Sequence, residues 1–121
     1  MPSFDSLISA TKVAAVFPES IRDKTILITG VSPNSLGLAT AVALASQQPS
    51  RLILSGRSAE KVQSAVDSLR SAYPLAKYDV LLMDLSSQTS VRAAATRINE
   101  DVNIPAIDIL INNAGVTVCA I

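Results

Sequence analysis

Residues 25–39 read TILITGVSPNSLGLA. The first five residues form a short β-branched and leucine-rich run without polar alternation, which is typical of a strand buried on both faces. A turn with a glycine at each end, Gly30 and Gly37, follows and opens directly into an apolar segment that we expect to be helical over about 36–48. Pro49 is expected to help end this helix. The stretch therefore predicts a strand, a tight turn and a helix that lies against a sheet.

Three more apolar runs, at residues 52–54, 80–83 and 107–111, are predicted as strands for the same reason. Between the runs the apolar spacing changes to that of one-sided helices. Two sets of residues follow this spacing: Val62, Ala65, Val66 and Leu69, then Val91, Ala94, Ala95 and Ile98. Ser58 and Ser87 stand where N-cap residues are expected, because a short side-chain oxygen can accept an amide proton of the first turn.

The alternation of strands and helices predicts an α/β protein. Because crossovers between parallel strands are right-handed, these strands should form a partial Rossmann-like, doubly wound parallel sheet of about four strands in the order 3-2-1-4. The fourth strand would form an edge, and the helix near 88–101 would lie alone on its face of the sheet. We therefore expect exposed apolar area on that face and self-association through the fourth strand.

Composition excludes several classes of function. The chain has 121 residues, a formal net charge of zero and no basic block, so nucleic-acid binding is not expected. It has no histidine, which excludes imidazole bases and HExxH zinc sites. The single cysteine, Cys119, can form neither an internal disulfide nor a thiolate metal cage, and no apolar run is long enough to span a bilayer. We expect a cytoplasmic protein without a metal or membrane partner.

The glycine turn has the physical properties of a phosphate site. A helix N-terminus presents unpaired amides and a partial positive charge, Gly30 allows a tight turn, and Gly37 allows close packing of helix on strand. Hydroxyl and amide side chains in the turn could donate to a phosphate. The candidate binding residues of this turn are Gly30, Ser32, Asn34, Ser35, Leu36 and Gly37. The alternative is a purely structural turn, since many α/β proteins have glycine here without binding a nucleotide.

Four motifs at the ends of the predicted strands together resemble those of the short-chain dehydrogenase/reductase family. They are Thr29-Gly30 with Gly37, Gly56-Arg57, Asp84-Leu85 and Asn112-Asn113-Ala114-Gly115. The resemblance covers about residues 24–116. The glycine turn has one extra residue and carries Asn34 and Ser35 where longer-loop relatives have glycines.

The resemblance implies a nicotinamide cofactor. Arg57 stands where an acid would bind the ribose of NAD, and a guanidinium there favours the 2′-phosphate of NADP, with Ser58 as a second donor. The alternative for Arg57 is a solvated arginine at a helix start. Asp84 and Leu85 would border the adenine, although Asp84 could instead favour the positive end of the following helix. The resemblance implies that Asn112, Asn113, Ala114 and Gly115 hold the end of the fourth strand and let the nicotinamide-side ribose come close, with Asn112, Ala114 and Gly115 as candidate binding residues. These residues could equally tie neighbouring strands together.

The implied function is hydride transfer between NADP(H) and a carbonyl or alcohol substrate. The family's catalytic serine and Tyr-x-x-x-Lys pair would lie beyond Ile121, so we expect residues 23–121 to form a truncated NAD(P)-binding Rossmann half-domain after an N-terminal helical extension at 1–22. Tyr73 and Lys77 have the family spacing, but their place between a helix and a strand indicates coincidence. The alternative is a catalytically inactive, truncated nucleotide-binding or interaction module.

Overall fold

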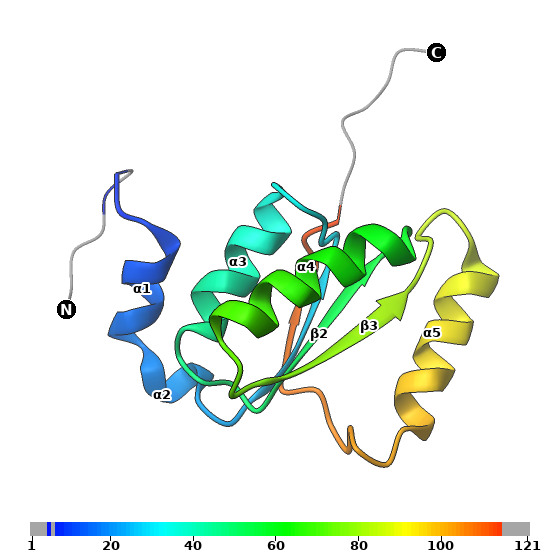
Figure 1. Ribbon diagram of the computed structural model, residues 1–121. Coiled ribbons are helices and arrows are strands. Elements are labelled where there is room, and N and C mark those ends of the chain that lie inside the picture. The colour runs from blue at the N-terminus through cyan, green and yellow to red at the C-terminus, as the bar shows by residue number, and fades with distance from the viewer. Residues whose placement is uncertain (1–4, 6, 115–121) are drawn as a thin grey trace.

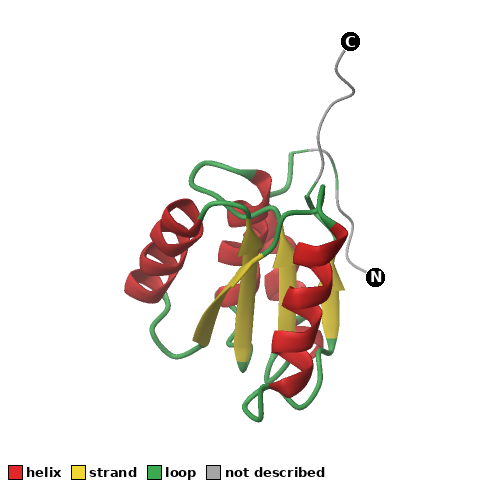
Figure 2. Cartoon of the chain, turned by 90° about the vertical axis from the view of Figure 1, so that its right-hand side faces the viewer, coloured by secondary structure: helices red, strands yellow, loops and turns green. Residues whose placement is uncertain are grey.

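The computed structural model describes residue 5 and residues 7–114. Its centre is a sheet of four parallel strands in the order β3-β2-β1-β4. The strands are β1 (Thr25–Thr29), β2 (Arg51–Gly56), β3 (Lys77–Leu82) and β4 (Ile109–Ile111). Figure 2 shows them side by side, with helices both in front of the sheet and behind it. The predicted α/β class and strand order are confirmed.

Two apolar clusters, one on each face of the sheet, form the core. On one face, α3 (Leu36–Ala45) and α4 (Ala59–Ala72) pack over side chains such as Ile26 and Ile28 of β1. On the other face, α5 (Gln88–Glu100) packs over Leu27 of the same strand. Successive side chains of β1 point to opposite faces of the sheet, and helices cover both faces. The three central residues of the strand are therefore all apolar and buried, as the sequence predicted.

Two short helices precede the sheet. The first, α1 (Ala10–Val16), packs against α3, and the second is α2 (Pro18–Ile21) (Figure 1). Pro18 opens α2 at its first position, where a missing amide costs no helical hydrogen bond. A second helical turn therefore begins at Pro18, just after α1 ends at Val16. Ala14 and Ile21 are buried in the α3 and α4 face of the core.

The helix after the glycine turn is shorter than predicted. Instead of reaching residue 48, α3 ends at Ala45. The amide of Gln47 donates to the Leu44 carbonyl at 3.0 Å, which tightens the last turn. Gln48 then has a φ of 60°, which reverses the chain toward β2. The residue with a positive φ after a helix is usually glycine or asparagine, so a glutamine in this conformation could not be predicted from the sequence.

The third strand begins earlier than its apolar run. Lys77 and Asp79 extend β3 in front of residue 80, because their backbone pairs with β2 and the Asp79 carboxylate forms an ion pair with Arg51. Arg97 of α5 donates to the carbonyl of Val80 at 2.7 Å. This long cationic side chain covers part of an edge strand, one of the ways in which proteins protect an open sheet edge.

The fourth strand is the less protected edge. Leu110 pairs in register with Leu27, on the α5 face, and its side chain is 55% exposed. Ile53 and Leu81 on the same face are 0% and 2% exposed, so α5 covers β2 and β3. The predicted uncovered area is therefore confined to β4. No helix among the described residues is long and apolar enough to cross a membrane.

Candidate functional site

A cleft of about 800 Å³ lies at the carboxyl ends of the strands, the upper end of the sheet in Figure 1. In open α/β sheets ligands bind at this end, where the chain turns from strand to helix. Loops after β1, β2, β3 and β4 all contribute to the walls. The lining residues are Thr29, Gly30, Val31, Ser32, Ser35, Leu36, Ser55, Gly56, Arg57, Ser58, Lys61, Val62, Met83, Asp84, Leu85, Ser86, Asn113 and Ala114.

The two glycines of the turn are required by close backbone packing. Gly30 has a φ of 74°, and a Cβ on it would lie 2.7 Å from the Cα of Ala114. A Cβ on Gly37 would lie 2.5 Å from the carbonyl oxygen of Gly30. Real Cβ atoms do not approach other atoms so closely, so both positions exclude a side chain. The predicted tight turn and close helix packing are observed.

The end of β1 is tied to the segment after β4 by the hydroxyl of Thr29. Its Oγ1 accepts hydrogen bonds from the amides of Asn113 at 3.1 Å and Ala114 at 3.0 Å. The Asn113 side chain donates from Nδ2 to the Gly30 carbonyl at 3.3 Å. These contacts hold Ala114 over the glycine turn. They show the strand-tying role that the sequence left open for this motif. The sequence reasoning named Thr29 in the Thr29-Gly30 motif but assigned it no part in this tie.

The side chain of Ser35 organises the glycine turn. Its Oγ accepts from the amides of Ser32 at 3.1 Å and Leu38 at 3.0 Å, and donates to the Ser32 carbonyl at 2.7 Å. It is the N-cap of α3, with a φ of −103°, so of the two residues Asn34 and Ser35 only Asn34 has a positive φ, 59°. In the described chain, the amides of Leu36 and Gly37 donate no hydrogen bond and remain available to an anion.

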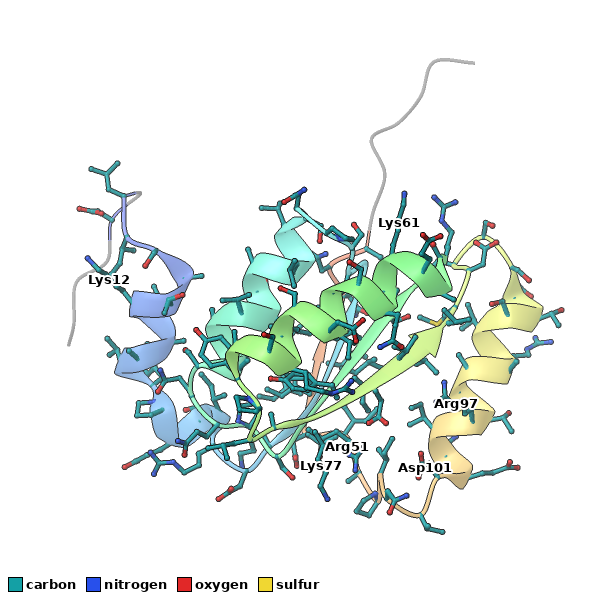
Figure 3. The ribbon with its side chains drawn as sticks, viewed as in Figure 1. Lys12, Arg51, Lys61, Lys77, Arg97 and Asp101 are labelled. Atoms are coloured by element: carbon teal, nitrogen blue, oxygen red, sulfur yellow. The ribbon has the colours of Figure 1, made fainter. Side chains whose placement is uncertain are left out.

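Two cationic side chains line the cleft, Arg57 directly after β2 and Lys61 in the first turn of α4. Arg57 is exposed, and among the described residues it has no hydrogen bond and no ion pair within 4.0 Å. Ser58 is the N-cap of α4, where its Oγ accepts from the Lys61 amide at 3.3 Å. Lys61 lies at the cleft end of the molecule in Figure 3. Sequence reasoning missed Lys61, although its position in the first turn after Ser58 is a usable signal.

An acid that follows β3, Asp84, lines the same cleft. The Asp84 carboxylate accepts from the Ser86 hydroxyl at 2.6 Å and the Ser86 amide at 3.0 Å. These two bonds, with a smaller effect of the Arg57 charge, lower the pKa of Asp84 below its usual value. Asp84 is therefore ionised at neutral pH. Leu36 and Leu85, which also line the cleft, are 80% and 54% exposed.

The structure brings most of the predicted site residues to the cleft. Those that line it are Gly30, Ser32, Ser35, Leu36, Arg57, Ser58, Asp84, Leu85 and Ala114. Asn34, Gly37 and Asn112 do not line it, and Gly115 lies outside the described residues. Lys77, of the Tyr73 to Lys77 pair, is at the opposite end of the sheet from Lys61 (Figure 3), where β3 begins. No group of three or more histidine, cysteine or acidic residues that could hold a metal is found within the described part.

Known proteins share this arrangement. The model of the short chain dehydrogenase family matches residues 24–120. The Oxidoreductase fscI of Fusarium equiseti is 40% identical over 113 residues, which cover 93% of this chain and 43% of the relative. The L-sorbose reductase of Gluconobacter frateurii, in a crystal structure with NADPH and L-sorbose, has a TM-score of 0.68 and 27% identity, over 79% of this chain and 35% of that one.

A short-chain dehydrogenase from Sphingobium yanoikuyae, in complex with NADPH, gives a TM-score of 0.62 and 30% identity over 76% of this chain and 34% of that one. The chain thus spans less than half the length of these relatives. The family model nevertheless covers all four strands and all the loops that form the cleft. The chain belongs to the short-chain dehydrogenase family.

Proposed function

We propose that the cleft binds NADP(H), and that the chain is the cofactor-binding part of an oxidoreductase that transfers a hydride between NADP(H) and a carbonyl or alcohol substrate. The observation that carries this proposal is the unpaired guanidinium of Arg57 at the end of β2, with Lys61 beside the same cleft. A phosphate is the ligand that two cations lining one cleft favour most. The NADPH complexes of two related enzymes support the same choice.

The other cleft residues fit the remaining parts of a dinucleotide. The free amides of Leu36 and Gly37, at the N-terminus of α3, suit a pyrophosphate. The ionised Asp84 can accept a hydrogen bond from the amino group of adenine. Ala114, held over Gly30, leaves room for a ribose because its side chain is small. The bound cofactor would supply or accept the hydride.

The share of these residues in the reaction is therefore binding and orientation. In the described chain, the Tyr73 and Lys77 pair stands at the wrong end of the sheet to act on a nicotinamide. Reduction of a carbonyl, with the tyrosine, lysine and serine that the family uses, is proposed for a protein of the relatives' length. A cytoplasmic location, expected from the single cysteine, is part of the same proposal.

Direct titration of the purified chain with NADPH and NADH tests the proposal. Charged hydrogen bonds contribute about 1–3 kcal/mol, so NADPH is expected to bind about five- to 150-fold more tightly than NADH in a calorimetric titration. Equal affinity for the two dinucleotides would contradict the assignment of Arg57. Failure of both to bind would contradict a nucleotide site.

We also propose that the chain associates with itself through β4. The open edge of this strand and the exposed Leu110 side chain support the proposal. We expect the sedimentation coefficient to rise with concentration, and amide hydrogen exchange in dilute solution to be faster at Ile109 and Ile111 than at Ile26 and Ile28. A monodisperse monomer whose β4 amides are as protected as those of β1 would overturn this proposal.

A further inference from the structure

We propose that the Ser35 side chain occupies the position at the start of α3 that a phosphate oxygen would take, and so lowers the affinity of the glycine turn for a dinucleotide. This inference rests on the proposed function, because it concerns the same cleft. In this role Ser35 reduces cofactor affinity by competing with the phosphate. The sequence had instead suggested that its hydroxyl could donate a hydrogen bond to the phosphate.

The hydrogen bonds of Ser35 carry the inference. A serine hydroxyl has one donor and two acceptor positions, and Oγ of Ser35 uses all three, toward the amides of Ser32 and Leu38 and the carbonyl of Ser32. The amides of Ser32 and Leu38, near the N-terminus of α3, are thus already hydrogen-bonded. The amides of Leu36 and Gly37 stay unpaired within the described residues. An arriving phosphate therefore meets two open donors and two that are already occupied.

A phosphate that binds all four amides must displace Oγ of Ser35. The displaced hydroxyl then loses both accepted bonds and the bond to the Ser32 carbonyl, and this loss reduces the net gain from the phosphate. Glycine at position 35 would remove the competing oxygen. Glycine fits the backbone at this position, which has an extended φ of −103° and ψ of 163°, and it is an acceptable N-cap residue.

The test compares Ser35→Gly with Ser35→Thr and the unaltered chain. Threonine keeps the hydroxyl and is also a good N-cap residue. Each protein is titrated by calorimetry with NADPH and with inorganic pyrophosphate, which has no ribose. Arg57 and Lys61 are the same in every variant, so a difference in pyrophosphate affinity between variants reports on the glycine turn. We expect Ser35→Gly to bind both probes about three- to thirtyfold more tightly, since bonds to a charged acceptor replace bonds to a neutral one. Ser35→Thr, which keeps the competing oxygen, should show no such gain.

A matched control is Ser9→Gly, which removes the same N-cap hydroxyl from α1, away from the cleft. It should leave both affinities unchanged. If the unaltered chain binds NADPH and Ser35→Gly binds it equally or more weakly, the inference is wrong while the proposed function stands. Tighter binding of NADPH without tighter binding of pyrophosphate would also overturn it. If no variant binds NADPH, the proposed function fails and the inference fails with it.

Discussion

Replacing Gly30 by alanine is expected to lower the free energy of unfolding by about 2–5 kcal/mol. Two causes add. The φ of 74° at Gly30 costs an L-residue about 1–2 kcal/mol. The new Cβ would also lie 2.7 Å from the Cα of Ala114, a backbone atom held in place by Thr29, and such overpacking costs about 1–3 kcal/mol. Urea unfolding followed by far-ultraviolet circular dichroism measures the loss.

Asn34→Ala is the matched control for this variant. Asn34 also has a positive φ, 59°, but its side chain is exposed, so alanine there meets the conformational cost without the packing cost. We expect a loss of about 1 kcal/mol or less at position 34. If Gly30→Ala costs no more than Asn34→Ala, the close contact between the glycine turn and Ala114 does not contribute to stability.

Replacing Arg57 by alanine is expected to weaken the binding of NADPH about five- to 150-fold and to leave the binding of NADH almost unchanged. The guanidinium is exposed and has no protein partner in the described structure, so its removal breaks no contact within the fold. Its only proposed partner is the 2′-phosphate, which NADH lacks. The preference for NADPH over NADH should therefore be lost in this variant.

The matched control is Arg70→Ala, near the other end of α4. Arg70 is 54% exposed, and its guanidinium lies 3.8 Å from the carboxylate of Asp67, so the substitution removes an equal charge without touching the cleft. It should bind both dinucleotides as the unaltered chain does. If Arg57→Ala weakens NADPH and NADH by the same factor, Arg57 does not contact the 2′-phosphate. If it changes neither affinity, Arg57 is a solvated side chain.

The fold could be predicted from sequence because its signals are local and repeated. Each strand contains an apolar run, and the helices between them show helical spacing with Ser58 and Ser87 confirmed as N-caps. The errors concern the bounds of strands, which depend on pairing with residues that are distant in sequence. β3 begins at Lys77 because Asp79 forms an ion pair with Arg51 of the neighbouring strand. No local sequence pattern predicts that pair. β4 is shorter than its apolar run because only three of its residues pair with β1.

The site was predictable in part for a related reason. The motifs at the strand ends place most candidate residues at one cleft, because the carboxyl ends of parallel strands meet at one edge of the sheet. Sequence could not reveal how polar groups pair there. That the Ser35 hydroxyl turns back onto the Ser32 backbone, and that Thr29 accepts two amides from beyond β4, depends on the folded geometry of the loops.

The most direct test of the central claim, that the cleft is the NADP(H) site, is an amide NMR spectrum of the ¹⁵N-labelled chain titrated with NADPH. The account predicts saturable shifts in three segments that line the cleft, residues 30–38, 57–61 and 84–86, and little change at Arg51 and Lys77 at the opposite end of the sheet. Shifts that cluster around Lys77, or a spectrum that stays unchanged at high NADPH concentration, would contradict it.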